Sequence, residues 1–167
     1  MCRVAAIISR NNILLEKGIS AMTNAMHRGG PDDAGILINN IDGYALGHRR
    51  LSIIDLSPLG HQPMIDDLLQ IEITYNGEIY NYQSLKEELE ILGYTFFSES
   101  DTEVLIKGYD AWGTTILLNK LRGMFAFVMI DKKKSILFAA RDHAGIKPLY
   151  IARNNESIIF SSEIRGI

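Results

Sequence analysis

GMFAFVMID at residues 123–131 and SILFAAR at residues 135–141 are two apolar runs separated by only three lysines. Both runs contain the aromatic and β-branched side chains that strands favour, and the lysines suit an exposed tip. The stretch therefore predicts an antiparallel hairpin. A second hairpin is predicted directly after it, where an Asn-Asn turn separates LYIAR at 149–153 from SIIFSS at 157–162.

The N-terminal third also predicts short strands around one helix. RVAAII at 3–8 is apolar after its arginine, as in a fully buried strand. Apolar residues recur at helical spacing over 13–26, which predicts an amphipathic helix. An Asp-Gly turn then separates strands predicted at 35–40 and 44–49, so these two form a third hairpin.

The middle of the chain predicts one more strand and the remaining helices. The strand is expected at 69–75, and NGEIYN continues from it as a loop. A surface helix is expected over 82–92, followed by a short strand at 95–97. Ser-Asp at 100–101 would cap a further helix, with Glu103 in a capping-box pattern. Antiparallel hairpins with helices kept in blocks favour the α+β class.

Composition limits the kind of protein. The chain has 167 residues, of which 47% are hydrophobic and 22% charged, as expected for one globular domain with a sizeable core. A net charge of −3 gives no basic footprint, so nucleic acid is not an expected partner. No apolar run approaches the ~20 residues of a membrane span, and no secretory signal precedes the first strand. A single cysteine excludes an internal disulfide, so we expect a cytoplasmic protein. The four histidines share no metal-ligand spacing, so no metal site is expected.

That single cysteine, Cys2, is a candidate for covalent chemistry. If Met1 is removed, one residue carries a thiol, with a pKa of about 8.5, and an α-amino group that titrates at about 7.7–8.0. The amine could then act as the base for the thiol, as in triad variants that use the N-terminal amine. Taken alone, a lone cysteine is more often a small buried side chain, so the rest of the chain decides between the two interpretations.

Several stretches resemble one family, in the family's order along the chain. Beside the N-terminal Met-Cys they are HRRLSIID (48–55), YNGEIYN (75–81), SESDTEVL (98–105) and the segment from GMFAFVMID to ARDHAGIKPLYI (123–151). Together they resemble the type-2 glutamine amidotransferase domain at the N-terminus of glutamine-hydrolysing asparagine synthetases. The resemblance covers essentially all of residues 1–167. It implies a four-layer αββα Ntn-hydrolase sandwich with two antiparallel sheets.

The resemblance also implies an activity and its partners. Such a domain hydrolyses glutamine to glutamate and ammonia through a cysteine thioester, with no cofactor of its own. The ammonia passes in cis to a C-terminal synthetase domain, which makes asparagine from aspartate with ATP and Mg. That domain is expected beyond Ile167, so this chain would be the N-terminal part of a longer one. The oligomeric state is left open, a homodimer included.

Roles for individual residues follow from the same resemblance. Cys2 aligns with the nucleophile, and the Asn76 side-chain amide with the Gly77 N–H forms the oxyanion hole. Without the flanking motif, Asn-Gly would more often be a turn. Arg50 aligns with the family's clamp on the substrate carboxylate, a task that suits a planar bidentate donor. Leu51, Ser52, Ile53 and Ile54 would line the substrate, and Asp101 with Glu78 would bind its ammonium group.

The roles of Arg50 and Asp101 depend on the local geometry of a strand and of a helix start. Arg49 and Arg50 would point to opposite faces of a strand, so only one of them can reach the site. Asp101 is also a good helix-capping residue, and both roles can hold together. Arg141 and Asp142 are expected to be scaffold or interface residues.

The sequence departs from the family in one loop. The family reads H-R-G-P-D where this chain has HRGGPD at 27–32. The extra glycine is expected to loosen the loop, and no substrate role is assigned to Arg28. A retained Met1 would block the α-amine of Cys2 and leave the protein inactive.

Two other functions stay open at this point. The domain could serve another ammonia-using synthase, or it could be a non-catalytic domain of the same fold used for binding or regulation. The second predicts loss of Cys2, Asn76, Gly77 or Asp101, and all four are present.

Overall fold

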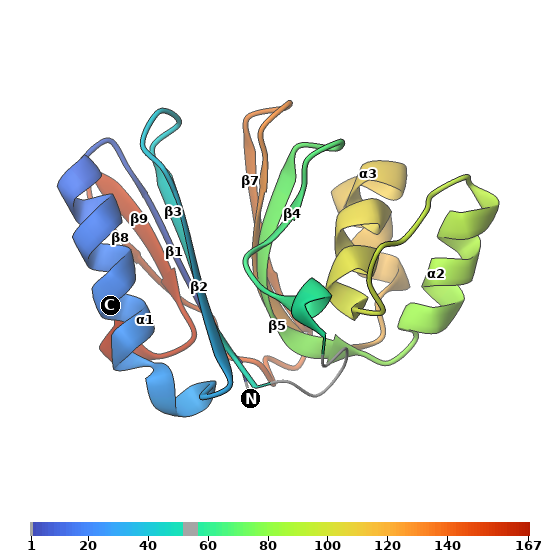
Figure 1. Cartoon of the computed structure of the whole chain (residues 1–167), viewed down its shortest axis with the longest axis horizontal. Coiled ribbons are helices and arrows are strands. Elements are labelled where there is room, and N and C mark those ends of the chain that lie inside the picture. The colour runs from blue at the N-terminus through green and yellow to red at the C-terminus, as the bar shows by residue number, and fades with distance from the viewer. Residues whose placement is uncertain (1, 52–56) are drawn as a thin grey trace.

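The protein forms four layers, with two antiparallel sheets packed face to face between helices (Figure 1). The structure is a computed structural model, and it describes residues 2–51 and 57–167. No helix among these residues is long and apolar enough to cross a membrane. The expected αββα arrangement with two antiparallel sheets is thus confirmed.

The first sheet has five strands in the order β2-β3-β1-β9-β8. Its centre is β1, which pairs with β3 on one side and β9 on the other, so the N-terminal strand is fully enclosed. The Asp-Gly hairpin and the Asn-Asn hairpin are both confirmed, and they supply the two edges of the sheet. The strands are β1 (Arg3–Ser9), β2 (Asp33–Asn39), β3 (Tyr44–Arg50), β8 (Tyr150–Arg153) and β9 (Ser157–Ser161).

The second sheet has four strands in the order β4-β5-β6-β7. The hairpin with the three-lysine tip is confirmed as its β6–β7 pair, in which Asp131 lies opposite Ile136. Its strands are β4 (Met64–Asp66), β5 (Ile71–Ile79), β6 (Gly123–Asp131) and β7 (Ile136–Arg141).

Helices cover the outer face of each sheet (Figure 1). A π-helical turn, η1 (Leu14–Gly18), leads into α1 (Ile19–Ala25) on the five-stranded sheet. The four-stranded sheet is covered by α2 (Tyr82–Ile91) and α3 (Asp101–Lys120), and α3 kinks at Gly113, where φ is 71°. Three short 3-10 turns complete the structure: η2 (His27–Gly29), η3 (Pro58–Gly60) and η4 (Ile164–Gly166).

Alternation along the strands divides the apolar side chains among three layers of core. In β1, Ala5 and Ile7 face α1, whereas Ala6 faces the second sheet. In β6, Phe125 and Phe127 face α2 and α3, whereas Val128 lies between the sheets. The strands β1 and β6 are buried on both faces, which explains why these two read as nearly continuous apolar runs.

Polar side chains also bridge the two sheets. The Tyr44 hydroxyl donates to the Glu72 carboxylate at 2.8 Å, and Nδ1 of His48 lies 3.1 Å from Oγ1 of Thr74. The Thr74 hydroxyl donates to the backbone carbonyl of Gly47, so it accepts from Nδ1–H of His48. The imidazole is fully buried, and its Nε2 has no partner among the described residues. These bridges lie on the facing sides of β3 and β5 and tie one strand to the other.

Some local predictions are wrong. β5 does not stop at 75 but runs to Ile79, because β6 pairs with it along its whole length. Residues 95–97 form no strand, since none of the described strands pairs with them. Glu103 does not close a capping box on Ser100, because its carboxylate accepts hydrogen bonds from the backbone of Phe97 and Ser98 instead.

The HRGGPD loop is packed closely, contrary to the expectation that it is loosened. A Cβ on Gly30 would lie 2.3 Å from the carbonyl carbon of Arg49, and one on Gly29 would lie 2.5 Å from Cγ of Arg3. The two glycines therefore let the loop approach β1 and β3. Arg28 is exposed.

Burial of His48 predicts a loss of stability in acid. Burial lowers the pKa of His48 from 6.5 to about 3, so between these pH values the unfolded chain binds a proton that the folded chain does not. Unfolding free energy should fall by up to about 1.4 kcal/mol per pH unit over that window. Urea titrations from pH 7 to 4 measure it. His48→Gln should show a shallower decline than the parent, and an equally steep one would contradict this account.

Candidate active site

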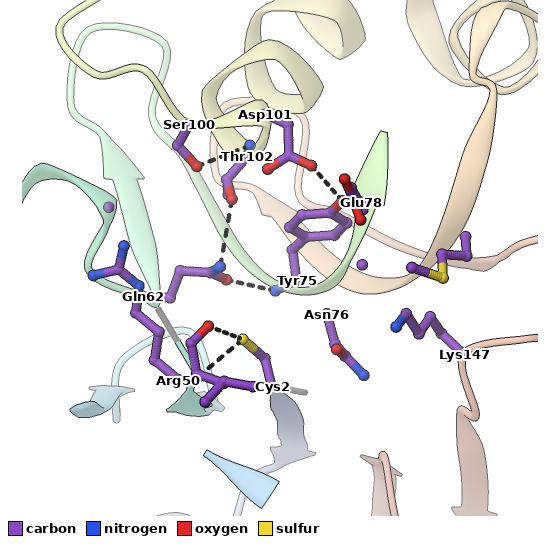
Figure 2. A pocket seen from close by; sticks show the side chains of 14 residues that line it. Cys2, Arg50, Gln62, Tyr75, Asn76, Glu78, Ser100, Asp101, Thr102 and Lys147 are labelled. Carbon is purple, nitrogen blue, oxygen red and sulfur yellow. Dashed lines mark hydrogen bonds between the residues drawn. The ribbon is translucent and has the colours of Figure 1, made fainter. Parts of the chain in front are cut away.

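A cavity of about 110 Å³ is lined by residues from both sheets and from the start of α3 (Figure 2). It lies at the end of the sheets where β1 begins and β3 and β5 end. Residues far apart in sequence meet there: Cys2, Arg50, Leu51, Gly60, Gln62, Tyr75, Asn76, Gly77, Glu78, Ser100, Asp101, Thr102, Met124 and Lys147.

The Cys2 thiol lies in this cavity, just before β1. Its Sγ accepts a hydrogen bond from the Leu51 N–H at 3.3 Å and lies 3.5 Å from the Leu51 carbonyl. The backbone carbonyl of Cys2 accepts from Arg3, whose guanidinium also pairs with Glu163, so the residue is held at two points. Burial raises the pKa of the thiol, and the Leu51 N–H and the Arg50 charge only partly oppose this effect. The thiolate therefore needs further stabilisation or a base.

The Asn76 side chain supplies a buried donor with no acceptor. Its residue is 2% exposed, and Nδ2 has no hydrogen-bond partner among the described residues. Leaving a buried amide donor unpaired costs roughly 1–3 kcal/mol, so such a group needs an explanation. A substrate with a hydrogen-bond acceptor at this position would pair with the donor.

Gly77 lies within β5, opposite Phe125 of β6, so the expectation that Asn76-Gly77 is a loop or turn is wrong. The backbone N–H and C=O of Phe125 both bond Asp142 on the far side of β6. In an antiparallel ladder such a residue does not bond the other neighbour, so the polar groups of Gly77 point away from β6. A Cβ on Gly77 would also lie 2.4 Å from the carbonyl oxygen of Met124, so the position accepts only glycine without rearrangement.

The neighbours of Gly77 indicate where its N–H points. The N–H of Tyr75 donates to Oε1 of Gln62 at 2.7 Å, and the N–H of Ile79 donates to Oδ2 of Asp101 at 3.0 Å. Alternate residues of a strand direct their N–H groups to the same edge. The Gly77 N–H therefore points to the cavity edge of β5.

The structure separates the two arginines at the end of β3. Arg50 is 7% exposed and lines the cavity. Arg49 points to the helix side, where it donates to the Thr23 carbonyl at 3.0 Å and to Oδ1 of Asn24 at 2.7 Å. The strand thus sends only one guanidinium to the site, as the alternation of side chains predicts.

Asp101 brings a buried carboxylate to the opposite wall. Its Oδ2 accepts from the Tyr75 hydroxyl at 2.6 Å and from the Ile79 N–H. Burial raises the pKa of Asp101, while these two hydrogen bonds lower it. The helix cap itself is Ser100, whose hydroxyl accepts from the Thr102 N–H. Asp101 is therefore free of the capping role.

Two cavity residues, Gln62 and Lys147, were not predicted from the sequence. Gln62 links the walls, because its amide bonds both Tyr75 and the Thr102 hydroxyl. Nothing in the loop-like SPLGHQP segment distinguishes it. Lys147 is 2% exposed and belongs to the ARDHAGIKPLY motif. The motif indicated the family, but the sequence did not indicate which of its residues enters the cavity.

The remaining predicted residues divide into two groups. Leu51 and Glu78 line the cavity. Ser52, Ile53 and Ile54, like Met1, lie outside the described residues. In the described part of the chain, no group of three or more His, Cys, Asp or Glu side chains could hold a metal ion.

Comparisons with known proteins agree on one family. A family model described as a glutamine amidotransferase domain matches residues 1–167. The chain is 41% identical to the putative glutamine-hydrolyzing asparagine synthetase 2 of Methanocaldococcus jannaschii, over all of this chain and 35% of that protein. It is 43% identical to the glutamine-hydrolyzing asparagine synthetase 1 of Bacillus subtilis, over 91% of this chain and 23% of that protein. The chain thus spans about a third or less of these relatives.

Two other matches concern the fold and the range of proteins that contain a similar domain. Glutamine phosphoribosylpyrophosphate amidotransferase from B. subtilis superimposes with a TM-score of 0.82 over 99% of this chain and 42% of that chain, at 21% identity. The two share the Ntn-type fold. Amidase chry2 of Gibberella zeae is 37% identical over 99% of this chain and 26% of that protein.

Replacement of Gly77 by alanine should destabilise the protein. Its Cβ would overlap backbone atoms of Met124 and Phe125, which cannot move without disturbing the β5–β6 pair. We expect a loss of about 1–3 kcal/mol of unfolding free energy, as for other overpacked sites. Gly18→Ala is the control, because its Cβ would meet only flexible side-chain ends of Ile7 and Leu14. Urea unfolding measures the free energy of unfolding of both variants. Equal values would contradict the requirement for glycine at position 77.

Proposed function

Because the chain belongs to the glutamine amidotransferase domain family, we propose that its cavity hydrolyses the side-chain amide of glutamine to glutamate and ammonia. The observation that carries the proposal is the buried amide nitrogen of Asn76, which has no hydrogen-bond partner in the described part of the chain and shares one small cavity with the Cys2 thiol and the charged groups of Arg50 and Asp101. A site of this kind has a nucleophile, an oxyanion donor and two charges for an amino acid.

Substrate binding would use the two charged walls. The Arg50 guanidinium offers parallel donors to the α-carboxylate of glutamine. Asp101, with Glu78 at the cavity wall, accepts from the α-ammonium group. Tyr75 and Gln62 hold these walls in place, because they are hydrogen-bonded to each other, to Asp101 and to Thr102. Leu51 supports the substrate chain, and Ser52, Ile53 and Ile54 are proposed to contact the substrate as well.

The reaction would proceed through a thioester. After Met1 is removed, the α-amine of Cys2 takes the thiol proton and Sγ bonds to the amide carbon of glutamine. Negative charge moves to the amide oxygen, which accepts hydrogen bonds from Asn76 Nδ2 and the Gly77 N–H. The carbon–nitrogen bond then breaks, and the amine returns a proton to the leaving ammonia. Water attacks the thioester, the carbon–sulfur bond breaks, and glutamate leaves with the thiol restored.

The ammonia would be used by a longer protein. Since the relatives are glutamine-hydrolyzing asparagine synthetases that extend well beyond the matched domain, we propose that a C-terminal synthetase domain in cis consumes the ammonia. That domain, and not this one, would bind ATP, Mg and aspartate. Arg141 and the loop after it are proposed to face it. The similarity to amidase chry2 keeps a different acceptor as the second candidate.

The direct test is glutamate release from glutamine. Protein that begins at Cys2 should be active, and protein that retains Met1 should have no measurable activity because its α-amine is blocked. Cys2→Ala should abolish turnover, since the chain has no other cysteine. Mass spectrometry verifies the first residue of each sample. Turnover by the Cys2→Ala protein would move the nucleophile to another residue.

Asn76→Ala should separate catalysis from binding. The donor acts on an oxyanion that exists only in the transition state, so we expect kcat to fall by about 10²–10³ with little change in KM. Asp67→Asn, on the exposed surface, is a control that should behave as the parent. If Asn76→Ala raised KM and left kcat unchanged, the amide would be a substrate clamp instead.

A further inference from the structure

Lys147 is a buried cation in the wall of the cavity. It is 2% exposed, and it lines the same space as Cys2, Asn76 and Glu78. Figure 2 shows its amine pointing into the cavity from the side opposite Arg50. A lysine is rarely buried unless negative charge compensates it. The position therefore places a positive charge in the cavity that also holds the Cys2 thiol and the Glu78 carboxylate.

The loop that carries Lys147 is held rigidly. The Asp142 carboxylate accepts from the backbone N–H groups of Phe125, Ile146 and Lys147 at 3.2, 2.8 and 2.9 Å. These bonds hold the pKa of Asp142 below its ordinary value, although burial opposes them. Arg141 closes the turn by donating to the carbonyl of Gly145. The backbone of Lys147 is thus fixed to β6, and this restricts the positions that its amine can take in the cavity.

Charges of both signs surround the thiol. Arg50 from β3 and Lys147 from the loop are cations, whereas Glu78 from β5 and Asp101 from α3 are acids, and Tyr75 adds a phenol. Burial lowers the pKa of Lys147, while the charges of Cys2 and Glu78 raise it. Burial raises the pKa of the Cys2 thiol. Each group alone resists its charged form, and the two charged forms stabilise each other.

We propose that Lys147 is a positioning residue that supplies a fixed positive charge to the thiolate of Cys2, with Glu78 as its opposing charge. The proposal rests on Cys2 as the nucleophile of the proposed function and deepens it. It also assigns a task to the ARDHAGIKPLY motif, in which Asp142 holds the loop and Lys147 delivers the charge.

Alkylation of Cys2 by iodoacetamide tests the proposal, because only the thiolate reacts and the chain has one cysteine. The rate is measured against pH on protein that begins at Cys2. Lys147→Met should move the midpoint up by about one pH unit, a tenfold loss of thiolate below the midpoint. Lys147→Arg should stay close to the parent. Glu78→Gln should move the midpoint down. Lys133→Met, at the exposed hairpin tip, should leave it unchanged.

The alkylation experiment tests the role of Lys147 separately from the proposed glutaminase activity. A folded Lys147→Met protein with the parent midpoint overturns the inference, whether or not glutamine is hydrolysed. A shifted midpoint supports it even if glutaminase activity is absent, which would count against the proposed function alone. Thermal unfolding establishes that each variant is folded. If Lys147→Met does not fold, Glu78→Gln decides, and an unshifted midpoint there overturns the inference.

Discussion

The packing of two sheets against each other is the constraint on which the rest of the structure depends. Cys2 directly precedes β1 and Arg50 ends β3 in the five-stranded sheet, whereas Asn76 and Gly77 lie in β5 of the four-stranded one. A small slide of one sheet over the other would separate the proposed nucleophile from the proposed oxyanion donors, and apolar contacts alone resist sliding weakly because they are not directional. The polar bridge from His48 to Thr74 is directional, and it lies between the same two strands that carry Arg50 and Asn76. It therefore fixes the alignment as well as the packing.

The cavity itself is costly to fold. An amide nitrogen with no partner among residues 2–51 and 57–167, a desolvated thiol, a buried carboxylate and a buried ammonium face one small space, and the removal of each from water costs free energy. Backbone hydrogen bonds on Asp101 and Asp142 and the large apolar layers around them offset that cost. The groups are consequently preorganised, which is the arrangement that favours charge developing during a reaction.

Much of the fold follows from local patterns. The three hairpins and the helices over 82–92 and from 101 onward were predicted, because turn residues and periodicity are properties of short segments. The strand through Asn76 and Gly77 was not, because Asn-Gly ordinarily favours a turn and only pairing with β6 overrides that preference. Residues 95–97 also show that pairing decides. Their side chains favour a strand, but none of the described strands pairs with them. Glu103 was misassigned because backbone donors from Phe97 and Ser98 compete for its carboxylate.

By itself the sequence determined the hairpins, the α+β class, the resemblance to one family and, through that resemblance, the candidate site residues Cys2, Arg50, Asn76, Gly77 and Asp101. These are properties of residue type, order and spacing. Only the tertiary structure decided that the Arg50 side chain lies in the cavity while that of Arg49 lies on the helix side, that Asn76 Nδ2 has no partner among the described residues, and that Lys147 is buried in the same cavity as Cys2. Burial and hydrogen-bond satisfaction depend on which distant segments meet, and here they meet only when the two sheets close on each other.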